Sequence, residues 1–278
     1  MSDRSLVNAY DELRSTWSPR TRARKALRDA AVMLFSLRKS IGSTSGWIRF
    51  PYYHHVFRDE RRGFSRQLDY LNNFGDFLSL DQAVDLLASG SPVDGRYFCV
   101  TFDDGIRSCY EHAFPILAEK EISAGFFVVT QYTADTGAGE TRVCRPLHPG
   151  AAHSNQYLTW QECREILQAG MVLGSHTCSH LSLIDSDADE IRRQLSRSKQ
   201  TIEAKLAVAC NHFACPWGIP RKNFLVDRDP QIARDLGYRS FLTTERGPMM
   251  RAGDPYRIRR DHILAVWGNY QLRYFLSL

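Results

Sequence analysis

Several features that mark other protein classes are missing from this sequence. No apolar run approaches the roughly 20 residues that a membrane-spanning helix needs. The 7 cysteines are odd in number and include no Cys-x-x-Cys pair, which argues against a disulfide framework or a zinc ribbon and favours a reducing compartment. A signal-peptide pattern is also missing, because charged residues of both signs precede any hydrophobic segment. We therefore expect a cytoplasmic protein.

What is present is the composition of a globular domain. Of 278 residues, 43% are apolar, which is enough to bury a full core. No Pro/Gly/Ser-rich linker or low-complexity tract divides the chain after residue 50. We expect one large β/α domain over 46–278, preceded by a basic helical extension over 1–45. The net charge of +5 is mild, so we expect no nucleic-acid partner.

The extension is predicted to form two helices, over 6–16 and 20–41, with Ser18-Pro19 as the break. In the second helix, apolar residues alternate with arginine and lysine. One interpretation is an amphipathic helix that lies on an anionic membrane surface. The other, more common for such helices, is packing against the outside of the domain or against a partner subunit. The segment 42–46, rich in glycine and serine, is expected to be a flexible joint.

After residue 46, strands and helices alternate. Strands are predicted at 47–53, 97–100, 125–129, 171–173, 213–218 and 240–243, followed by a final segment at 256–263. Helices are predicted at 64–74, at 110–121 with a break at Pro115, and at 160–169, 187–207 and 229–236. A further helix, capped by Ser79 or Asp81, is predicted to end at Leu87. The segment 131–157 is aperiodic and is expected to be a functional or mobile loop, whose His148 and His153 face substrate or are inert. This alternation predicts a parallel β/α barrel or sheet.

Two adjacent carboxylates, Asp103 and Asp104, follow the apolar run at 97–100 at the exit of a predicted buried strand. Charge at such a position must be paired, hydrated or bound to a cation. His176 and His180 are four residues apart, so on a helical turn their imidazoles would share one face. Two neutral histidines and a carboxylate form the ligand set of hydrolytic metal sites. We predict Asp104 as the third ligand and Asp103 as a general base that removes a proton from water.

Three motifs occur in a recognisable order: TFDDG at 101–105, SHTCSH at 175–180 and FACPWG at 213–218. Together they resemble the motifs of the NodB-type polysaccharide deacetylases, carbohydrate esterase family 4, with alanine replacing the usual arginine in the third. The resemblance spans about 97–218. It implies a distorted (β/α)7 barrel, similar to a TIM barrel, and metal-dependent hydrolysis of an N-acyl group on an amino sugar.

The resemblance also implies roles for individual residues. Asp103 would be the base, and one divalent transition metal, typically Zn2+ with Co2+, Ni2+ or Fe2+ as alternatives, would be held by three residues, Asp104, His176 and His180. The backbone N–H of Trp217, which follows Pro216, would help to stabilise the oxyanion, and the indole ring would form a wall of the acyl pocket.

The sequence departs from the family pattern at the catalytic acid, because no late Leu-x-His motif is present. The segment PYYHH at 51–55 resembles circularly permuted relatives, in which the equivalent histidine precedes the Asp-Asp motif. We therefore predict His54 as the acid that protonates the leaving amine, with His55 as the second candidate and His262 as the third. Of Arg259 and Arg260, we favour Arg260 as the partner of Asp103 that lowers the pKa of this base.

The leading hypothesis is a metal-dependent carbohydrate N-deacylase that removes acetyl or formyl from an amino sugar in glycan or surface-polysaccharide biosynthesis. Without an export signal, the substrate would be nucleotide-linked, lipid-linked or a glycan intermediate at the inner face of the membrane. The basic extension would suit a lipid-linked substrate through peripheral membrane contact. Two alternatives are an O-acetyl esterase that acts on a glycan and a catalytically silent glycan-binding module.

Overall fold

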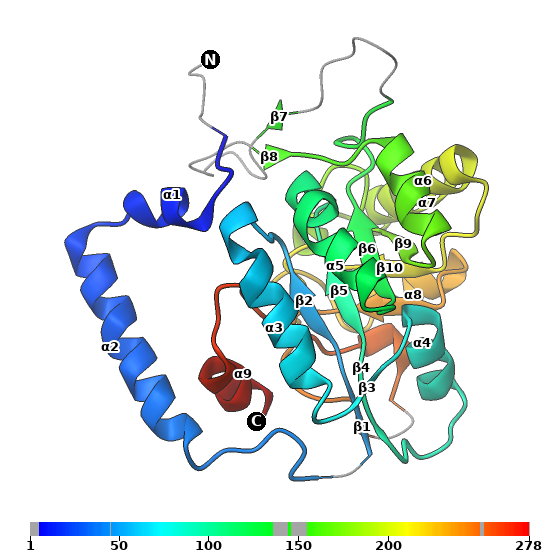
Figure 1. The fold of residues 1–278 in the computed structure, drawn as a ribbon. Helices are drawn as coiled ribbons and strands as arrows, with labels where there is room; N and C mark the ends of the chain where they lie inside the picture. The colour runs from blue at the N-terminus through cyan, green and yellow to red at the C-terminus, as the bar shows by residue number, and fades with distance from the viewer. Residues whose placement is uncertain (1–5, 45, 136–143, 146–154, 251–252, 278) are drawn as a thin grey trace.

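A computed structural model describes residues 6–44, 46–135, 144–145, 155–250 and 253–277 (Figure 1). The α-helices are α1 (Tyr10–Ser15), α2 (Pro19–Ser36), α3 (Arg61–Leu71), α4 (Leu80–Ala88), α5 (Phe114–Glu119), α6 (Trp160–Gln168), α7 (Ala188–Leu206), α8 (Asp229–Asp235) and α9 (Asn269–Leu276). The 3-10 turns are η1 (Arg58–Glu60), η3 (Leu183–Asp185) and η4 (Pro255–Arg257), and η2 (Cys109–Ala113) is a π-helical turn.

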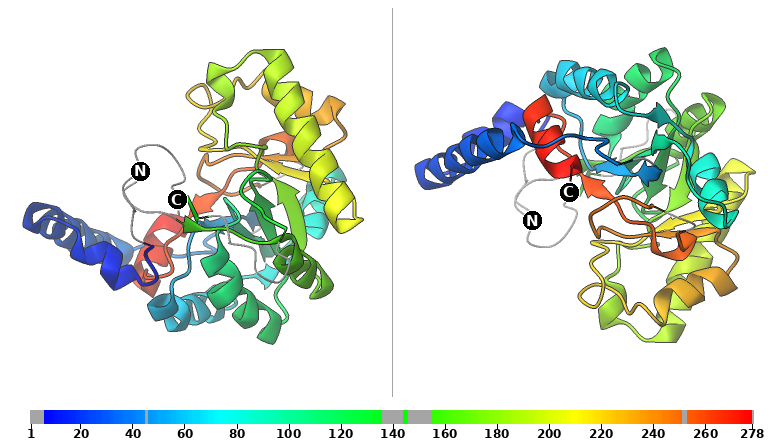
Figure 2. Two further views of the ribbon diagram at one scale, coloured as in Figure 1. Left: turned by 90° about the horizontal axis from the view of Figure 1, so that it is seen from above. Right: turned by 90° about the horizontal axis from the view of Figure 1, so that it is seen from below.

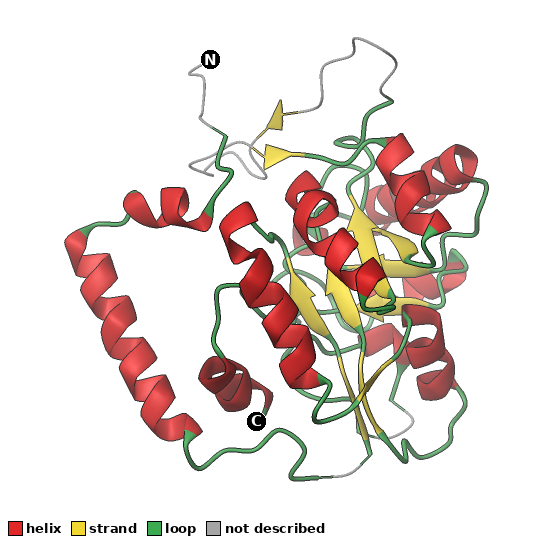
Figure 3. Ribbon diagram, viewed as in Figure 1, coloured by secondary structure: helices red, strands yellow, loops and turns green. Residues whose placement is uncertain are grey.

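The strands lie at the centre of the molecule and most helices lie around them (Figures 2 and 3). They are β1 (Trp47–Arg49), β2 (Pro51–Tyr53), β3 (Asp76–Phe77), β4 (Arg96–Phe98), β5 (Val100–Phe102), β6 (Ala124–Val128), β7 (Cys144–Arg145), β8 (Asn155–Gln156), β9 (Val172–Ser175), β10 (His212–Ala214), β11 (Ser240–Leu242) and β12 (Asp261–His262).

The main sheet has seven strands in the order β11-β10-β9-β6-β5-β2-β12, and every pairing in it is parallel. The segment before β12 bridges the far edge of this sheet, because Ile258 pairs with Leu242 at the end of β11. The sheet therefore curls toward closure. This arrangement confirms the predicted distorted (β/α)7 barrel.

Two predicted strands are each divided in the structure. The single strand expected at 47–53 is interrupted at Phe50, and β4 and β5 are separated at Cys99. Their first halves pair in a separate three-stranded sheet, β1-β4-β3, while their second halves join the main sheet. Phe50 and Cys99 are fully buried in one apolar cluster with Leu80 and Phe127. The sequence did not reveal the division, because the apolar run continues through the linking residue.

The predicted helix boundaries are largely confirmed. Thr159 and Glu162 form a reciprocal capping box at the start of α6, and Asp187 caps α7 by accepting a hydrogen bond from the Glu190 N–H. The break near Pro115 is also confirmed, since η2 ends at Ala113 and α5 begins at Phe114 with this proline in its first turn. The C-terminal helix α9 was not expected from the sequence.

The segment 131–157 contains more structure than the expected aperiodic loop. Strands β7 and β8 pair there in an antiparallel two-stranded sheet, and Tyr157 forms a bridge with Ile106. His148 and His153 lie outside the described residues.

The two helices expected in the extension are present, with Ser18 as the N-cap of α2 and Pro19 in its first turn. The second helix ends at Ser36, five residues earlier than expected, and packs on α9. The N–H groups of Tyr10 and Asp11 donate hydrogen bonds to Asp59, which attaches α1 to the domain (Figure 1). The division of the chain at residue 45 stays a prediction.

Candidate metal-dependent active site

The predicted site residues come from the carboxyl ends of parallel strands, which meet at one edge of a barrel. Five strands contribute them: β5 leads to Asp103 and Asp104, β9 to His176 and His180, β2 to His54, β10 to Trp217, and β12 carries His262. Strand register brings them together, since Tyr53 lies beside Phe102 and Ser175 beside Val128. Residues more than 200 positions apart in the chain therefore share one site.

Three of these side chains converge closely. His176 Nε2 lies 3.2 Å and His180 Nε2 3.3 Å from Oδ1 of Asp104. All three residues are buried, and their candidate ligand atoms lie within 4.8 Å of one another. Burial by itself raises the pKa of Asp104, but the neighbouring imidazoles of His176, His180 and His54 outweigh it and hold that pKa well below the usual value.

The ring of His176 is oriented by the backbone. Its Nδ1 lies 2.7 Å from the carbonyl oxygen of Ala214 at the end of β10. A carbonyl can only accept, so Nδ1 carries a proton, and in the neutral ring Nε2 then presents a lone pair toward Asp104. This is the tautomer that a metal-ligating histidine requires.

The expectation that His176 and His180 share a helical turn is wrong. Residues 176–180 form an irregular loop in which Thr177 and His180 have positive φ angles of 65° and 60°. The two imidazoles meet because this loop reverses the chain, and the side-chain oxygen of Gln194 on α7 accepts hydrogen bonds from the N–H groups of Cys178 and Ser179. The sequence held no signal for this support from a distant helix.

Left-handed backbone is concentrated at the site. Asp104 and Trp217, like the two loop residues above, have positive φ, at 70° and 55°. Such conformations cost free energy in residues other than glycine and persist where the surrounding structure imposes them, often at functional sites. In this protein, the residues with this unfavourable backbone conformation include Asp104 and His180, whose ligand atoms converge at the site.

The residues present fit a divalent cation. Both carboxylate oxygens of Asp104 are buried, and neither makes a hydrogen bond of good geometry within the described part of the chain. A buried carboxylate in that state needs positive charge nearby. Two imidazole nitrogens and a carboxylate oxygen form a donor set that suits zinc and related transition metals. The three residues could therefore hold one ion and leave coordination positions for water and substrate.

Asp103, next to the triad, is held by Arg260. The guanidinium makes two parallel hydrogen bonds, Nη1 to Oδ1 and Nη2 to Oδ2, each 2.7 Å long. Burial raises the pKa of Asp103, but the charges of Arg260 and His176 exceed this effect and lower it overall. Arg260 is fully buried and also donates from Nε to the carbonyl oxygen of Thr243. Of the two candidate arginines, the structure therefore places Arg260 on Asp103, and Arg259 lies beside Glu245.

The three candidate acids occupy different positions. His54 Nε2 lies 3.9 Å from Oδ2 of Asp104, and its Nδ1 lies 3.2 Å from Nε2 of His262. Burial, followed by the charge of His54, lowers the pKa of His262 to about 3 and that of His55 to about 4. His55 stacks on Phe57 instead of joining this pair. His54 is thus the candidate beside the triad, and His262 contacts its outer nitrogen.

Trp217, from the third motif, lies against His180 of the triad. Its ring contacts that of His180 edge to face, with the centroids 4.4 Å apart, while 41% of the residue remains exposed. Within the described residues, its backbone N–H donates no hydrogen bond. Pro216 precedes it at the start of a turn in which Gly218 N–H donates to the Pro216 carbonyl. An unpaired N–H and a partly open ring therefore border the site.

Sequence reasoning missed the residues that support Arg260. Tyr52 on β2 packs its ring 4.4 Å from the guanidinium carbon, and the hydroxyl of Thr101 lies 3.4 Å from Nη1. Tyr52 also contacts the rings of His54 and His262. Its position in PYYHH could have suggested a role, because alternate residues of a strand point to the same side and Tyr52 is two residues before His54.

Comparisons with known proteins agree with this geometry. A family model described as polysaccharide deacetylase matches residues 90–241, which is more than half of the chain. Among curated proteins, the chain is similar to YxkH of Bacillus subtilis (strain 168), named as a polysaccharide deacetylase. The two are 22% identical over 241 residues, which cover 82% of this chain and 78% of YxkH.

Two solved structures share the fold. IcaB from Ammonifex degensii has a TM-score of 0.67 and 24% identity, with 84% of this chain and 98% of that chain covered. The Streptococcus pyogenes deacetylase PplD, solved in complex with acetate, has a TM-score of 0.66 and 23% identity, with 84% and 100% covered. The matched region 90–241 contains all three motifs on which the resemblance was based. The chain belongs to the polysaccharide deacetylase family.

Proposed function

We propose that this protein is a metal-dependent N-deacylase that hydrolyses an N-acetyl or N-formyl group on an amino sugar. One observation carries the proposal: a buried Asp104, His176 and His180 cluster lies beside Asp103, whose two oxygens are held by Arg260. A ligand cluster next to a fixed carboxylate is what hydrolysis of an unactivated amide requires, since both the carbonyl and water need activation.

The chain's own groups divide the proton transfers. Asp103 accepts the proton of the attacking water through a lone pair that Arg260 does not engage, and the bidentate contact fixes the direction of this carboxylate. The free N–H of Trp217 donates to the carbonyl oxygen as negative charge develops there. His54 gives a proton from Nε2 to the leaving amine, so that a carboxylic acid and a free amine result.

A divalent cation held by Asp104, His176 and His180 would supply Lewis acidity, which polarises the acyl carbonyl and makes water more acidic. We propose zinc, with cobalt, nickel or iron as alternatives, because imidazole with one carboxylate suits these metals.

For the substrate, we propose an amino sugar that is nucleotide-linked, lipid-linked or part of a glycan intermediate, reached in the cytoplasm or at the inner face of the membrane. The deacetylase PplD shares this fold and was solved with acetate, the product expected from an N-acetyl substrate. The exposed ring of Trp217 offers a surface on which an acyl group or a sugar could pack.

The experiment measures metal and turnover on the same preparations. We expect about one zinc-like ion per chain by elemental analysis after dialysis, and its loss in both His176→Ala and Asp104→Ala. The exchange His212→Ala serves as the matched control, because His212 is a buried histidine bonded to Ser240 and Asp81 instead of the cluster.

Acetate and formate release would then be assayed on paired amide and ester derivatives of amino sugars. Turnover of amides that depends on the ion supports the N-deacylase. Turnover of esters alone would indicate an O-acetyl esterase instead of an N-deacylase. A site that binds none of zinc, cobalt and nickel would contradict the proposal that the protein is a metal-dependent hydrolase.

A further inference from the structure

Helix α2 leaves its large apolar side chains in solvent. The most exposed large apolar residues among those described lie between the middle of this helix and the residue that follows it: Leu27 (74%), Leu37 (68%), Leu34 (64%), Phe35 (61%) and Met33 (55%). Only Val32 and Ser36 of the helix are buried. Single exposed leucines are ordinary, but five large apolar side chains within eleven residues form a contiguous apolar surface of the kind that marks an interaction site.

The side of α2 that faces the domain is a different one. Ser36 accepts a hydrogen bond from Arg273 of α9, and Val32 lies one turn earlier on the same side. Leu27 and Leu34 are seven residues apart and, by helical periodicity, project away from this side. Packing on α9 therefore fixes the helix in place (Figure 2) without using its apolar face.

Positive charge accompanies the apolar face. Within α2 a single carboxylate, Asp29, stands against five cations: Arg20, Arg22, Arg24, Lys25 and Arg28. Arg38 and Lys39 follow the helix. Two copies of this surface would repel each other, because each carries the same excess of positive charge. An apolar layer beneath a negatively charged one would instead match both features.

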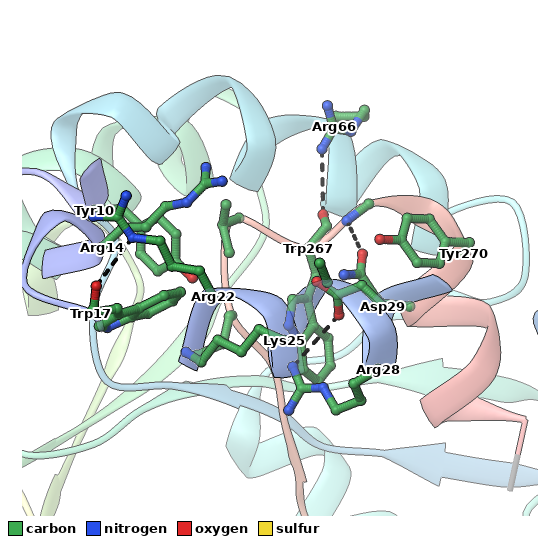
Figure 4. A pocket seen from close by; sticks show the side chains of 15 residues that line it. Tyr10, Arg14, Trp17, Arg22, Lys25, Arg28, Asp29, Arg66, Trp267 and Tyr270 are labelled. Carbon is green, nitrogen blue, oxygen red and sulfur yellow. Dashed lines mark hydrogen bonds and ion pairs between the residues drawn. The ribbon is translucent and has the colours of Figure 1, made fainter. Parts of the chain in front are cut away.

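A cavity of about 370 Å³ adjoins the basic half of the helix, between α1, α2 and the segment that leads into α9 (Figure 4). Arg14, Lys25 and Arg28 line it together with the rings of Trp17 and Trp267. The Lys25 ammonium lies 3.1 Å from the centre of the Trp17 ring. Lys25 lies seven residues before the buried Val32 and so faces the domain, which places this cavity behind the apolar face of α2.

We propose that the surface formed by α1 and α2 binds an anionic phospholipid bilayer. The side chains of Leu27, Leu34 and Phe35 enter the outer acyl layer, and the exposed arginines of α2, Arg20, Arg24 and Arg28, contact lipid phosphates. No helix in the described ranges is long and apolar enough to cross a membrane. In this arrangement α2 lies along the bilayer surface, and binding needs neither the metal site nor catalysis.

The test is co-sedimentation of the full chain with two kinds of vesicle, phosphatidylglycerol mixed with phosphatidylcholine and phosphatidylcholine alone. We expect binding to the anionic vesicles only, weakened by added salt. Two double exchanges probe the two features. Leu34→Ser with Phe35→Ser, and Arg24→Glu with Arg28→Glu, should each weaken binding by at least about tenfold.

Matched controls come from the opposite part of the molecule. Val208→Ser removes an apolar residue that is 39% exposed, and Arg192→Glu reverses an exposed charge on α7. Both should bind anionic vesicles as the parent does, and circular dichroism should show all variants folded.

Three results would overturn the proposal: equal binding to neutral vesicles, no effect of either double exchange, or self-association that only Leu34→Ser with Phe35→Ser abolishes. The last would mean that a second copy covers the apolar face. Because vesicle binding is measured without substrate, failure here would leave the deacylase proposal untouched.

Discussion

Replacing Arg260 by methionine should destabilise the fold more than most single substitutions. The side chain is fully buried, and its guanidinium donates two hydrogen bonds of 2.7 Å to Asp103 and one of 2.8 Å to the Thr243 carbonyl. Removal leaves the carboxylate of Asp103 buried without its counter-charge. Breaking a buried pair in this way costs about 3–5 kcal/mol, a large share of the roughly 5–15 kcal/mol that stabilises a typical domain.

The assay is urea unfolding with a chelator present, so that metal binding does not contribute to the free energy of unfolding. Arg192→Met is the control, because it removes an exposed arginine whose partner Asp235 is also exposed, and it should cost less than about 1 kcal/mol. Adding Asp103→Asn to Arg260→Met should recover part of the loss, since no buried charge then remains unpaired.

The pH dependence gives an independent check. In the parent the folded-state pKa of Asp103 is lowered, so its contribution to stability is present above the unfolded pKa of about 4 and is lost as pH falls through the folded value. Without Arg260, burial dominates and raises the pKa, so the variant regains stability when the carboxyl protonates. The difference in free energy of unfolding between the parent and Arg260→Met should therefore decrease from pH 7 toward pH 4. The reasoning would be refuted if Arg260→Met lost no more stability than Arg192→Met, or if the difference from the parent increased as pH falls.

Three further predictions concern the proposed proton carriers and a buried acid. Asp103→Asn should keep the metal but reduce turnover by at least about a hundredfold, because it removes the base and not a ligand. Loss of the metal in this variant would mean that the roles of Asp103 and Asp104 are exchanged. His54→Ala should likewise slow deacylation with metal retained, whereas His262→Phe should have a smaller effect, since His262 contacts only the outer nitrogen of His54; the reverse order would make His262 the acid. Burial raises the pKa of Glu60 to about 7 although its carboxylate accepts the Phe57 N–H. The contribution of Glu60 to the free energy of unfolding is complete below pH 4.5 and is lost as pH rises through 7, so the parent should lose up to about 3 kcal/mol of stability between pH 5 and 8. In urea titrations at several pH values, Glu60→Gln should show a weaker dependence of stability on pH. An unchanged dependence would contradict this assignment.

Local sequence was sufficient where the physics is local. Capping by Thr159 and Asp187 and the break at Pro115 depend on a few neighbouring atoms, so the helix ends could be predicted. The alternation of strands and helices predicted a parallel barrel or sheet, because parallel strands need crossover helices, and the resemblance to the family implied the barrel. The division at Phe50 could not be predicted, since it depends on which neighbour each half of the strand pairs with.

The sequence by itself also predicted the residues to which we assign the chemistry, because TFDDG and SHTCSH contain the carboxylates and imidazoles that such chemistry needs. Only the tertiary structure decided how they meet. The residues 176–180 form a left-handed loop held by Gln194 instead of the expected helical turn. Arg260, which the sequence already favoured over Arg259, contacts Asp103, and His54 lies against His262. These contacts join residues up to 208 positions apart. Their geometry follows from strand register and barrel closure, which no short stretch of sequence encodes.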